Sequence, residues 1–438
     1  MTLIELGSRE TRTNALDSLP VVIIGAGPIG LAAAANLVER GIDFELYETG
    51  ESSASSVRSW GHISLFSPWK HLIDPAARRL LEADGWREPR YANRAPTGAD
   101  LVRLYLEPLA SLGSIAPHAH TGVTVTAVTR QGMDRTRSTG RSQTPFALRI
   151  TDRGGAVTEI AARAVIDASG TYLSSNSLAS NGLEPLGIDR VADYVTPALP
   201  DVLGSERARF SGRHTTVVGA GHSAVNTLLS LWTLIQTAPT TTVTWVIRNT
   251  SAERVFTSAE DELAGRAALG SKVRKLVDRG VIELVDRFEI ASLDEVDGRV
   301  AITGHRNGGV EHLTTDLIVN ATGFRPDLGM LRELRLDLDV VVEAPVNLAP
   351  LIDPNLHSCG TVEPHGFVEL QHPEPGFFIA GMKSYGRAPT FLLATGYEQV
   401  RSITAHLAGD DDAARAIELQ LPATGVCATD SNDSSCCS

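Results

Sequence analysis

Cysteine is scarce in this sequence, and its placement excludes a fold held together by disulfide bonds. Only 4 cysteines occur among 438 residues, whereas a disulfide framework needs dense, paired cysteines. Cys359 stands alone, and Cys427, Cys436 and Cys437 all lie in the last dozen positions. No two cysteines have the Cys-x-x-Cys or Cys-x₄-Cys spacing of an internal redox-active dithiol.

Long apolar runs and an excess of positive charge are also missing. No run of about eighteen apolar residues, the length that spans a bilayer, is present. The net charge of −13 disfavours nucleic acid or an anionic membrane surface as the main partner. Residues 1–19 carry five charged side chains and lack the apolar core of a signal peptide. We therefore expect a globular protein of the cytoplasm, with two or three domains for its length.

What the sequence does contain is a glycine-rich turn between a strand and a helix. An apolar strand at 21–24 leads into Gly25-Ala-Gly27-Pro-Ile-Gly30, an alanine-rich helix runs to about residue 40, and a second strand ends on Glu48. In such a unit the three glycines allow the tight turn, the approach of a pyrophosphate and the packing of helix on strand. The helix N-terminus attracts phosphates, and Glu48 is placed to accept a ribose hydroxyl. This stretch predicts a dinucleotide site.

The same plan occurs a second time. A strand expected at 215–218 leads into Gly219-Ala-Gly221-His-Ser-Ala224, and a helix follows to about residue 236. The next strand, 243–247, is followed by Arg248 where the first copy has Glu48. An arginine there can pair with a 2′-phosphate, which favours NADPH over NADH. The alternative for Arg248 is a solvated surface side chain. Two copies predict two nucleotide-binding modules.

A buried strand and a small-residue turn close each copy, at Asp167-Ala-Ser-Gly170 and Ala321-Thr-Gly323. A further short strand ends on Gly381, and a helix is expected over 390–407 after Pro389. With these features the chain resembles the two-dinucleotide-binding flavoproteins over about residues 20–409. That superfamily includes flavin-containing monooxygenases, N-hydroxylases, thioredoxin reductases and mercuric reductases.

This resemblance implies an α/β fold with two Rossmann-like, three-layer nucleotide-binding domains, FAD on the first and NADPH on the second. It implies an N-terminal extension (1–19), an FAD-binding domain in two parts (20–175 and 316–408), an inserted NADPH-binding domain (176–315) and a flexible cysteine-containing tail (409–438). The helix that begins near Thr390 is expected to point its N-terminus at the flavin. The cofactor residues so predicted are Gly25, Gly27, Gly30, Glu48, Asp167, Gly170, Gly219, Gly221, Ala224, Arg248, Gly323, Gly381 and Thr390.

A narrower resemblance involves two segments and the cysteine tail. Trp60-Gly-His62 with Phe66-Ser-Pro-Trp69, and Lys383 to Phe391, are similar to the flavin monooxygenase-type proteins encoded beside arsenic-resistance genes. The two segments are predicted to supply the walls and polar donors of a substrate pocket. The alternative for the aromatic segment is the packing of a long connection. The candidate catalytic residues are Trp60, His62, Lys383 and Arg387, with His62 a candidate for proton transfer.

The three tail cysteines are candidate ligands for a soft metalloid, because thiolates prefer soft ions. The alternative is an unstructured terminus in which Cys427, Cys436 and Cys437 have no role.

Three functions are compatible with these observations. The first is an FAD-dependent NADPH monooxygenase that transfers one oxygen of O₂ to a soft nucleophile such as a trivalent arsenical. The missing dithiol favours it. The second is an NADPH-dependent reductase of a thiol or a metalloid, but Met382 stands where such reductases carry a ribityl-binding aspartate. The third is a non-enzymatic metalloid-binding flavoprotein. The expected partners are a small-molecule substrate and O₂, with no nucleic acid and no membrane, and a homodimer is left open.

Overall fold

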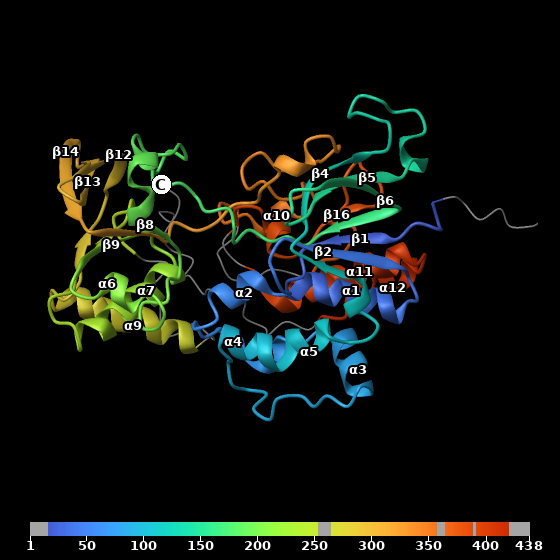
Figure 1. Cartoon of the computed structure of the whole chain (residues 1–438), viewed down its shortest axis with the longest axis horizontal. Coiled ribbons are helices and arrows are strands. Elements are labelled where there is room, and N and C mark those ends of the chain that lie inside the picture. The colour runs from blue at the N-terminus through green and yellow to red at the C-terminus, as the bar shows by residue number, and fades with distance from the viewer. Residues whose placement is uncertain (1–15, 253–263, 357–363, 389–390, 420–438) are drawn as a thin grey trace, which may run out of the picture.

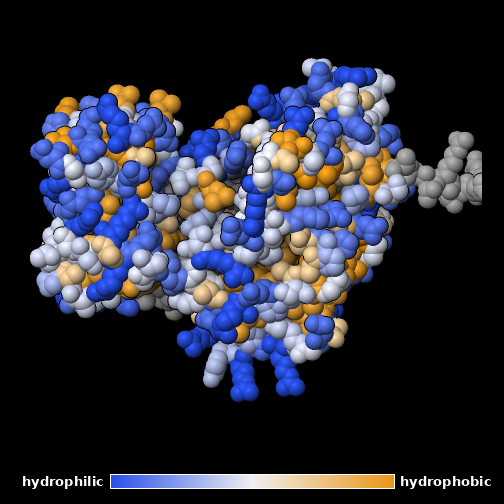
Figure 2. Space-filling model, in the orientation of Figure 1, coloured by the Kyte–Doolittle hydropathy of each residue, from blue (hydrophilic) through white to orange (hydrophobic). Residues whose placement is uncertain are grey.

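The computed structural model describes residues 16–252, 264–356, 364–388 and 391–419 (Figure 1). Thr390 and all four cysteines lie outside the described residues, so the predictions made for them stay predictions. The chain forms two lobes, and the space-filling view shows a notch in the surface between them (Figure 2).

The larger lobe is built on a parallel sheet of five strands in the order β16-β7-β1-β2-β3. The strands are β1 (Val21–Ile24), β2 (Phe44–Glu48), β3 (Ala119–Thr121), β7 (Ala164–Asp167) and β16 (Phe377–Ile379). β16 is far from the others in sequence, so the chain leaves this sheet after β7 and returns to it at the edge. The second sheet is formed by the segment in between.

Different layers cover the two faces of the first sheet. Helix α1 (Pro28–Glu39) packs on one face together with α3 (Pro75–Ala83) and α11 (Leu393–Leu407). The run Ala32–Ala35 is fully buried, and its small side chains allow a close approach of α1 to its neighbours. The other face packs against an antiparallel sheet of β4 (Thr124–Arg130), β5 (Phe146–Thr151) and β6 (Val157–Ala162).

The smaller lobe repeats this plan with a parallel sheet in the order β11-β10-β9-β15-β8. Its strands are β8 (Val195–Pro197), β9 (His214–Val218), β10 (Thr242–Val246), β11 (Glu283–Val285) and β15 (Leu317–Asn320). Helices α7 (His222–Ile235) and α9 (Ala264–Asp278) accompany it, with an antiparallel sheet of β12 (Glu289–Val296), β13 (Arg299–Arg306) and β14 (Gly309–Thr315). The fold is thus α/β with two Rossmann-like units, as predicted.

The other α-helices of the described residues are short. They are α2 (Ser55–Ser59), α4 (Gly98–Leu101), α5 (Glu107–Ala110), α6 (Arg207–Phe210), α10 (Ala349–Ile352) and α12 (Asp411–Arg415). One predicted boundary is wrong: the helix expected from residue 390 begins at Leu393, after the extended residue Leu392. A proline marks a favourable first turn, but it does not require the helix to begin there.

A buried ion-pair network ties the antiparallel sheet of the larger lobe to the segment before β16. Glu374 forms ion pairs with two arginines: its Oε1 lies 2.7 Å from Arg130 Nε, and its Oε2 lies 2.8 Å from Arg141 Nη2. All three side chains are at most 4% exposed. Burial alone would raise the pKa of Glu374, but hydrogen bonds from Arg141 and Arg130 outweigh it and hold the pKa below its usual value. Each buried charge is therefore paired.

Helix α3 begins at a buried carboxylate. Asp74 is its N-cap, and its Oδ1 accepts from the Ala77 N–H (2.8 Å) and from the Asn36 amide on α1 (3.3 Å). The cap thereby attaches α3 to α1. Burial raises the pKa of Asp74 to about 7, although these hydrogen bonds lower it in part.

This raised pKa predicts that the difference in stability between the unmodified protein and a variant without the Asp74 carboxyl group depends on pH. A carboxyl group with a higher pKa in the folded chain keeps its proton where the unfolded chain has released it, so stability is highest below about pH 4 and falls until about pH 7. Asp74→Asn preserves the cap and cannot ionise. We expect its advantage in free energy of unfolding to grow between these pH values, on the order of 4 kcal/mol at most.

Urea denaturation at pH 5 and at pH 8 measures this advantage. Asp410→Asn is the matched control, because Asp410 is the N-cap of α12 but its side chain is 51% exposed. A difference between Asp74→Asn and the unmodified protein that does not change with pH would contradict the prediction.

Candidate functional site

The first glycine turn forms an open cradle at the carboxyl edge of the parallel sheet of the larger lobe. Gly25 has φ +96°, and a Cβ there would lie 2.8 Å from the Ala168 carbonyl oxygen. A Cβ on Gly30 would lie 1.8 Å from the Gly25 carbonyl oxygen, so α1 approaches the turn too closely for a side chain. Around Gly27, by contrast, nothing lies within 4 Å of the Cβ position. The space above the turn is free for a ligand group.

The start of α1 suits an anion. Its N-cap is Gly27, which has no side chain to cap the helix, and the first turn contains no acidic residue. The first N–H groups of a helix have no partner within the helix, and the helix dipole is positive there. A pyrophosphate fits this donor set.

Glu48 lies directly beside the same turn. Its Oε2 accepts from the Ala26 N–H (2.8 Å), and its Oε1 accepts from the Gly50 N–H (2.8 Å) and the Ser55 hydroxyl (2.7 Å). Glu48 is only 7% exposed, and through these three hydrogen bonds it also holds the turn in place. Sequence reasoning missed this role, because the partner Ser55, the first residue of α2, belongs to no motif. The ribose contact of Glu48 stays a prediction.

The second glycine turn has the same geometry. Gly219 has φ +125°, a Cβ there would lie 2.2 Å from the Ala321 carbonyl oxygen, and the Cβ position of Gly221 is again open. Ala224 replaces the third glycine and is fully buried. Helix α7 starts after Gly221 without a side-chain cap or an acidic residue in its first turn. This turn therefore has the same free space and the same unpaired helix N–H groups as the first, and a phosphate group fits it equally well.

Arg248 follows β10 by two residues and is exposed. Its guanidinium makes no ion pair or hydrogen bond with any residue in the described part of the chain. It lies beyond the carboxyl end of a strand that pairs with β9, whose own carboxyl end leads into the second glycine turn. The side chain is thus available to an anionic ligand at that edge.

The two closing turns are near copies of each other. Asp167 Oδ1 accepts from the Ser169 N–H (3.1 Å) and hydroxyl (2.6 Å). In the smaller lobe, Asn320 Oδ1 accepts from the Thr322 N–H (3.2 Å) and hydroxyl (2.6 Å). Both turns end on a glycine with positive φ, +72° at Gly170 and +100° at Gly323.

Gly381 follows β16 and contacts the first module. Its φ is +72°, and a Cβ there would lie 3.0 Å from Ile29 of α1. Its N–H donates to Gln399 Oε1 on α11 at 2.7 Å. The amide of Gln399 in turn donates to Ser384 (2.9 Å) and contacts His365 Nε2 (2.8 Å). Sequence reasoning missed Gln399, which fixes this turn from a helix that begins after it.

The four candidate catalytic residues lie in different environments. Trp60 is half-buried and packs against Gly98, where a Cβ would lie 2.7 Å from the indole ring. His62 and Arg387 are exposed. Lys383 is only 2% exposed, and its ammonium group lies 2.7 Å from Asp167 Oδ2. Their catalytic roles stay predictions.

The aromatic segment also contacts the second module. The ring of Phe66 packs edge-on against His222, the first residue of α7, with ring centroids 5.1 Å apart. The loop that was predicted as a pocket wall therefore reaches the second glycine turn across the two lobes.

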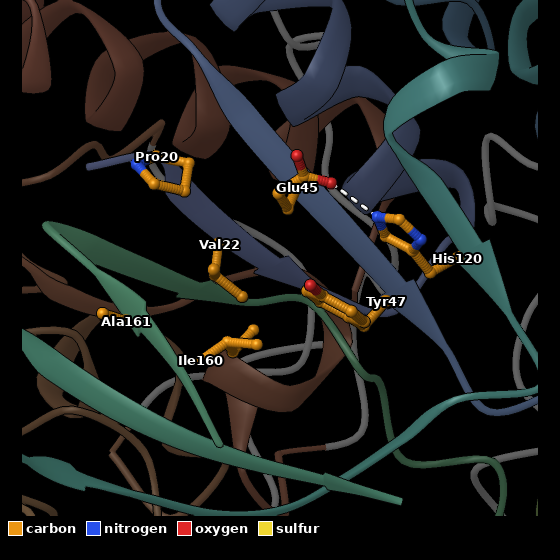
Figure 3. Close-up of a pocket in the computed structure, with 7 residues that line it drawn as sticks. All are labelled: Pro20, Val22, Glu45, Tyr47, His120, Ile160 and Ala161. Atoms are coloured by element: carbon orange, nitrogen blue, oxygen red, sulfur yellow. Dashed lines mark hydrogen bonds and ion pairs between the residues drawn. The ribbon is translucent and has the colours of Figure 1, made fainter. Parts of the chain in front are cut away.

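A separate pocket of about 310 Å³ lies on the face of the first sheet away from α1 (Figure 3). His120 Nε2 contacts Glu45 Oε2 at 2.5 Å, and the His120 ring stacks on Tyr47 at 4.9 Å. Burial, and then the nearby Glu45, raises the pKa of Tyr47 to about 12, so its hydroxyl stays neutral. The lining residues are Pro20, Val22, Glu45, Tyr47, His120, Ile160 and Ala161. None of them belongs to the glycine cradles.

Within the described residues, no group of three or more histidine, cysteine, aspartate or glutamate side chains is arranged to hold a metal ion. The same part of the chain contains no helix with the length and apolarity needed to cross a bilayer.

Comparison with known proteins gives one family and a set of similar folds. The family model described as pyridine nucleotide-disulphide oxidoreductase matches residues 22–347. No curated protein matches. Among solved structures, the bacillithiol disulfide reductase Bdr (YpdA) from Bacillus cereus is 19% identical with a TM-score of 0.64, over 89% of this chain and 99% of that chain.

Two oxygen-transferring proteins are similar to a comparable degree. The ornithine N-hydroxylase KtzI from Kutzneria sp. 744 is 15% identical with a TM-score of 0.59, over 91% of this chain and 100% of that chain. A mutant of the flavin monooxygenase from Stenotrophomonas maltophilia is 21% identical with a TM-score of 0.57, over 90% and 99%. At these identities the likeness shows the fold alone.

The first cradle yields a matched pair of substitutions. Gly30→Ala would force a methyl carbon against a backbone oxygen at 1.8 Å, and we expect it to lower the free energy of unfolding by at least about 2 kcal/mol. Gly27→Ala places the methyl in open space on an extended residue (φ −77°), so its loss should not exceed the cost of an alanine N-cap, about 1 kcal/mol. Denaturation curves of the two variants measure this difference, and equal losses would contradict the geometry.

Proposed function

We propose that this chain, which belongs to the pyridine nucleotide-disulphide oxidoreductase family, is an FAD-dependent monooxygenase that oxidises NADPH. The overall reaction consumes NADPH, a proton and O₂. One oxygen atom enters a soft nucleophilic substrate, and NADP⁺ and water are released. FAD, when bound, supplies the oxygen-activating chemistry. The residues of the chain bind and orient the reactants and keep water out.

The two open glycine turns support the two cofactors. FAD is assigned to the turn Gly25–Gly30, which lies beside Glu48. NADPH is assigned to the turn Gly219–Ala224, which lies at the same sheet edge as Arg248. Each turn combines an uncapped helix N-terminus with free space above its second glycine. A pyrophosphate requires this combination.

The observation that carries oxygen transfer over disulfide reduction is the cysteine pattern. None of the 4 cysteines is spaced as an internal dithiol, and a flavoprotein that reduces disulfides through such a pair needs one. The alternative is an NADPH-dependent reductase of a thiol or a metalloid, supported by the similarity in fold to a bacillithiol disulfide reductase. In that case Cys359 or the tail cysteines would supply the thiols.

The substrate is proposed to be a soft nucleophile, with a trivalent arsenical as the first candidate. This rests on the resemblance of Trp60–Trp69 and of the segment 383–391 to flavin monooxygenase-type proteins of arsenic-resistance loci. The tail cysteines Cys427, Cys436 and Cys437 would capture such a substrate, because thiolates bind soft ions. Small thiols and amines are the competing candidates.

Arg248 is expected to decide the choice of nicotinamide cofactor. A guanidinium contact with the 2′-phosphate contributes about 1.5–3 kcal/mol, so Arg248→Ala should raise the KM for NADPH at least tenfold and leave NADH nearly unaffected. Arg279→Ala is the control: this exposed arginine precedes β11, at the opposite edge of the same sheet. Steady-state kinetics with both nucleotides decide the matter. Equal losses for NADPH and NADH would rule out the assignment.

Oxygen use separates the two candidate activities. We expect the purified protein to be yellow, to oxidise NADPH slowly alone, and to consume O₂ faster when a trivalent arsenical, a small thiol or an amine is added. Paired traces of NADPH oxidation with and without oxygen measure this. If oxidation with substrate is equally fast without oxygen, the protein is a reductase.

A further inference from the structure

The two closing turns differ in charge at one position. Asp167 and Asn320 make the same pair of hydrogen bonds to the residue two positions ahead, with distances that agree within 0.1 Å. An asparagine therefore suffices to form this turn. The negative charge of Asp167 must serve another purpose.

That charge is paired with Lys383. The Lys383 ammonium donates to Asp167 Oδ2 (2.7 Å) and to the Ser169 hydroxyl (3.0 Å). The two charged side chains are at most 1% exposed. Removing two charges from water costs free energy that their attraction often fails to recover, so a buried pair is weak evidence for a stabilising role. In the smaller lobe Asn320 instead donates to the Asn176 carbonyl oxygen at 2.9 Å.

The pair lies at a functional edge of the sheet. β7 is between β1 and β16, and all three strands are parallel, so their carboxyl ends meet at one edge. The pyrophosphate cradle follows β1, and Glu48 marks the adenosine side at β2. The other half of a dinucleotide must then extend over β7 and β16, where Asp167 and Lys383 lie.

We propose that Lys383 and Asp167 set the reduction potential of the flavin. This inference rests on the proposed FAD site. Hydride transfer converts NADPH to NADP⁺ and brings one negative charge to the flavin. The Lys383 cation favours that charge, and the Asp167 carboxylate limits the effect. Both residues act through the electric field of their charges, and neither has to touch the reacting atoms. The pair also puts a carboxylate at this edge, where Met382 replaces the ribityl-binding aspartate expected from the resemblance.

Single substitutions should shift the potential in opposite directions. Asp167→Asn is compatible with the turn, as Asn320 shows, and it leaves the cation unneutralised. We expect it to favour flavin reduction at least tenfold, about 30 mV for a two-electron couple. Lys383→Met leaves an unpaired carboxylate and should disfavour reduction to a similar extent. The double variant should return close to the unmodified value, because both charges are removed.

The experiment is a redox titration of the FAD-loaded protein against reference dyes, with thermal stability measured in parallel. Glu374→Gln is the control, since it breaks the buried ion pairs of Glu374 with Arg130 and Arg141, on the far side of the sheet. It should lower stability without moving the potential. A merely structural role of Lys383 and Asp167 predicts the same behaviour for their variants.

The outcomes separate this inference from the proposed function. If the variants retain FAD and their reduction potentials are unshifted, the proposed effect of the charge pair is overturned and the monooxygenase proposal is left intact. Opposite shifts together with oxygen-independent turnover support the charge pair and overturn the monooxygenase. A full-length protein that binds no FAD overturns both.

Discussion

The structure of each lobe depends on the register between two parallel strands, the strand before the glycine turn and the strand before the closing turn. The same register occurs in both lobes. Ile24 pairs with Asp167 in the larger lobe, and Val218 pairs with Asn320 in the smaller lobe. A glycine follows the first strand of each pair immediately, so each glycine turn meets the backbone of the closing turn at a distance that excludes a side chain. The two turns proposed to bind the cofactors take their shape from these two contacts.

The insertion of one lobe into the other brings distant parts of the chain together. Lys383 meets Asp167 across 216 positions, and Arg130 meets Glu374 across 244. Both ion pairs join the returning segment near β16 to elements formed before the insertion. They therefore join the parts of the larger lobe that precede and follow the insertion, which a local motif cannot do.

Local chemistry explains why the glycine turns and their strands could be predicted. A left-handed φ at Gly25 or Gly219, a helix without a cap and an apolar strand are properties of neighbouring residues. The error at the start of α11 has the complementary cause. Pro389 suggested a first turn, but the helix begins where Leu392 leaves extended geometry and the residues after it pack on α1. Packing of this kind is not encoded in the next few residues.

The sequence by itself determined the α/β class, the two Rossmann-like units and the positions of their glycine turns, because spacing along the chain sets these features. Only the tertiary structure decided that Glu48 holds the turn it was predicted to serve, that Gln399 fixes the Gly381 turn, and that Lys383 is buried against Asp167 instead of lining an open pocket. Burial and ion pairing depend on which distant residues meet. Which residues meet is decided by how the sheets assemble. A charged side chain is buried without a large cost in free energy only where an oppositely charged partner lies beside it.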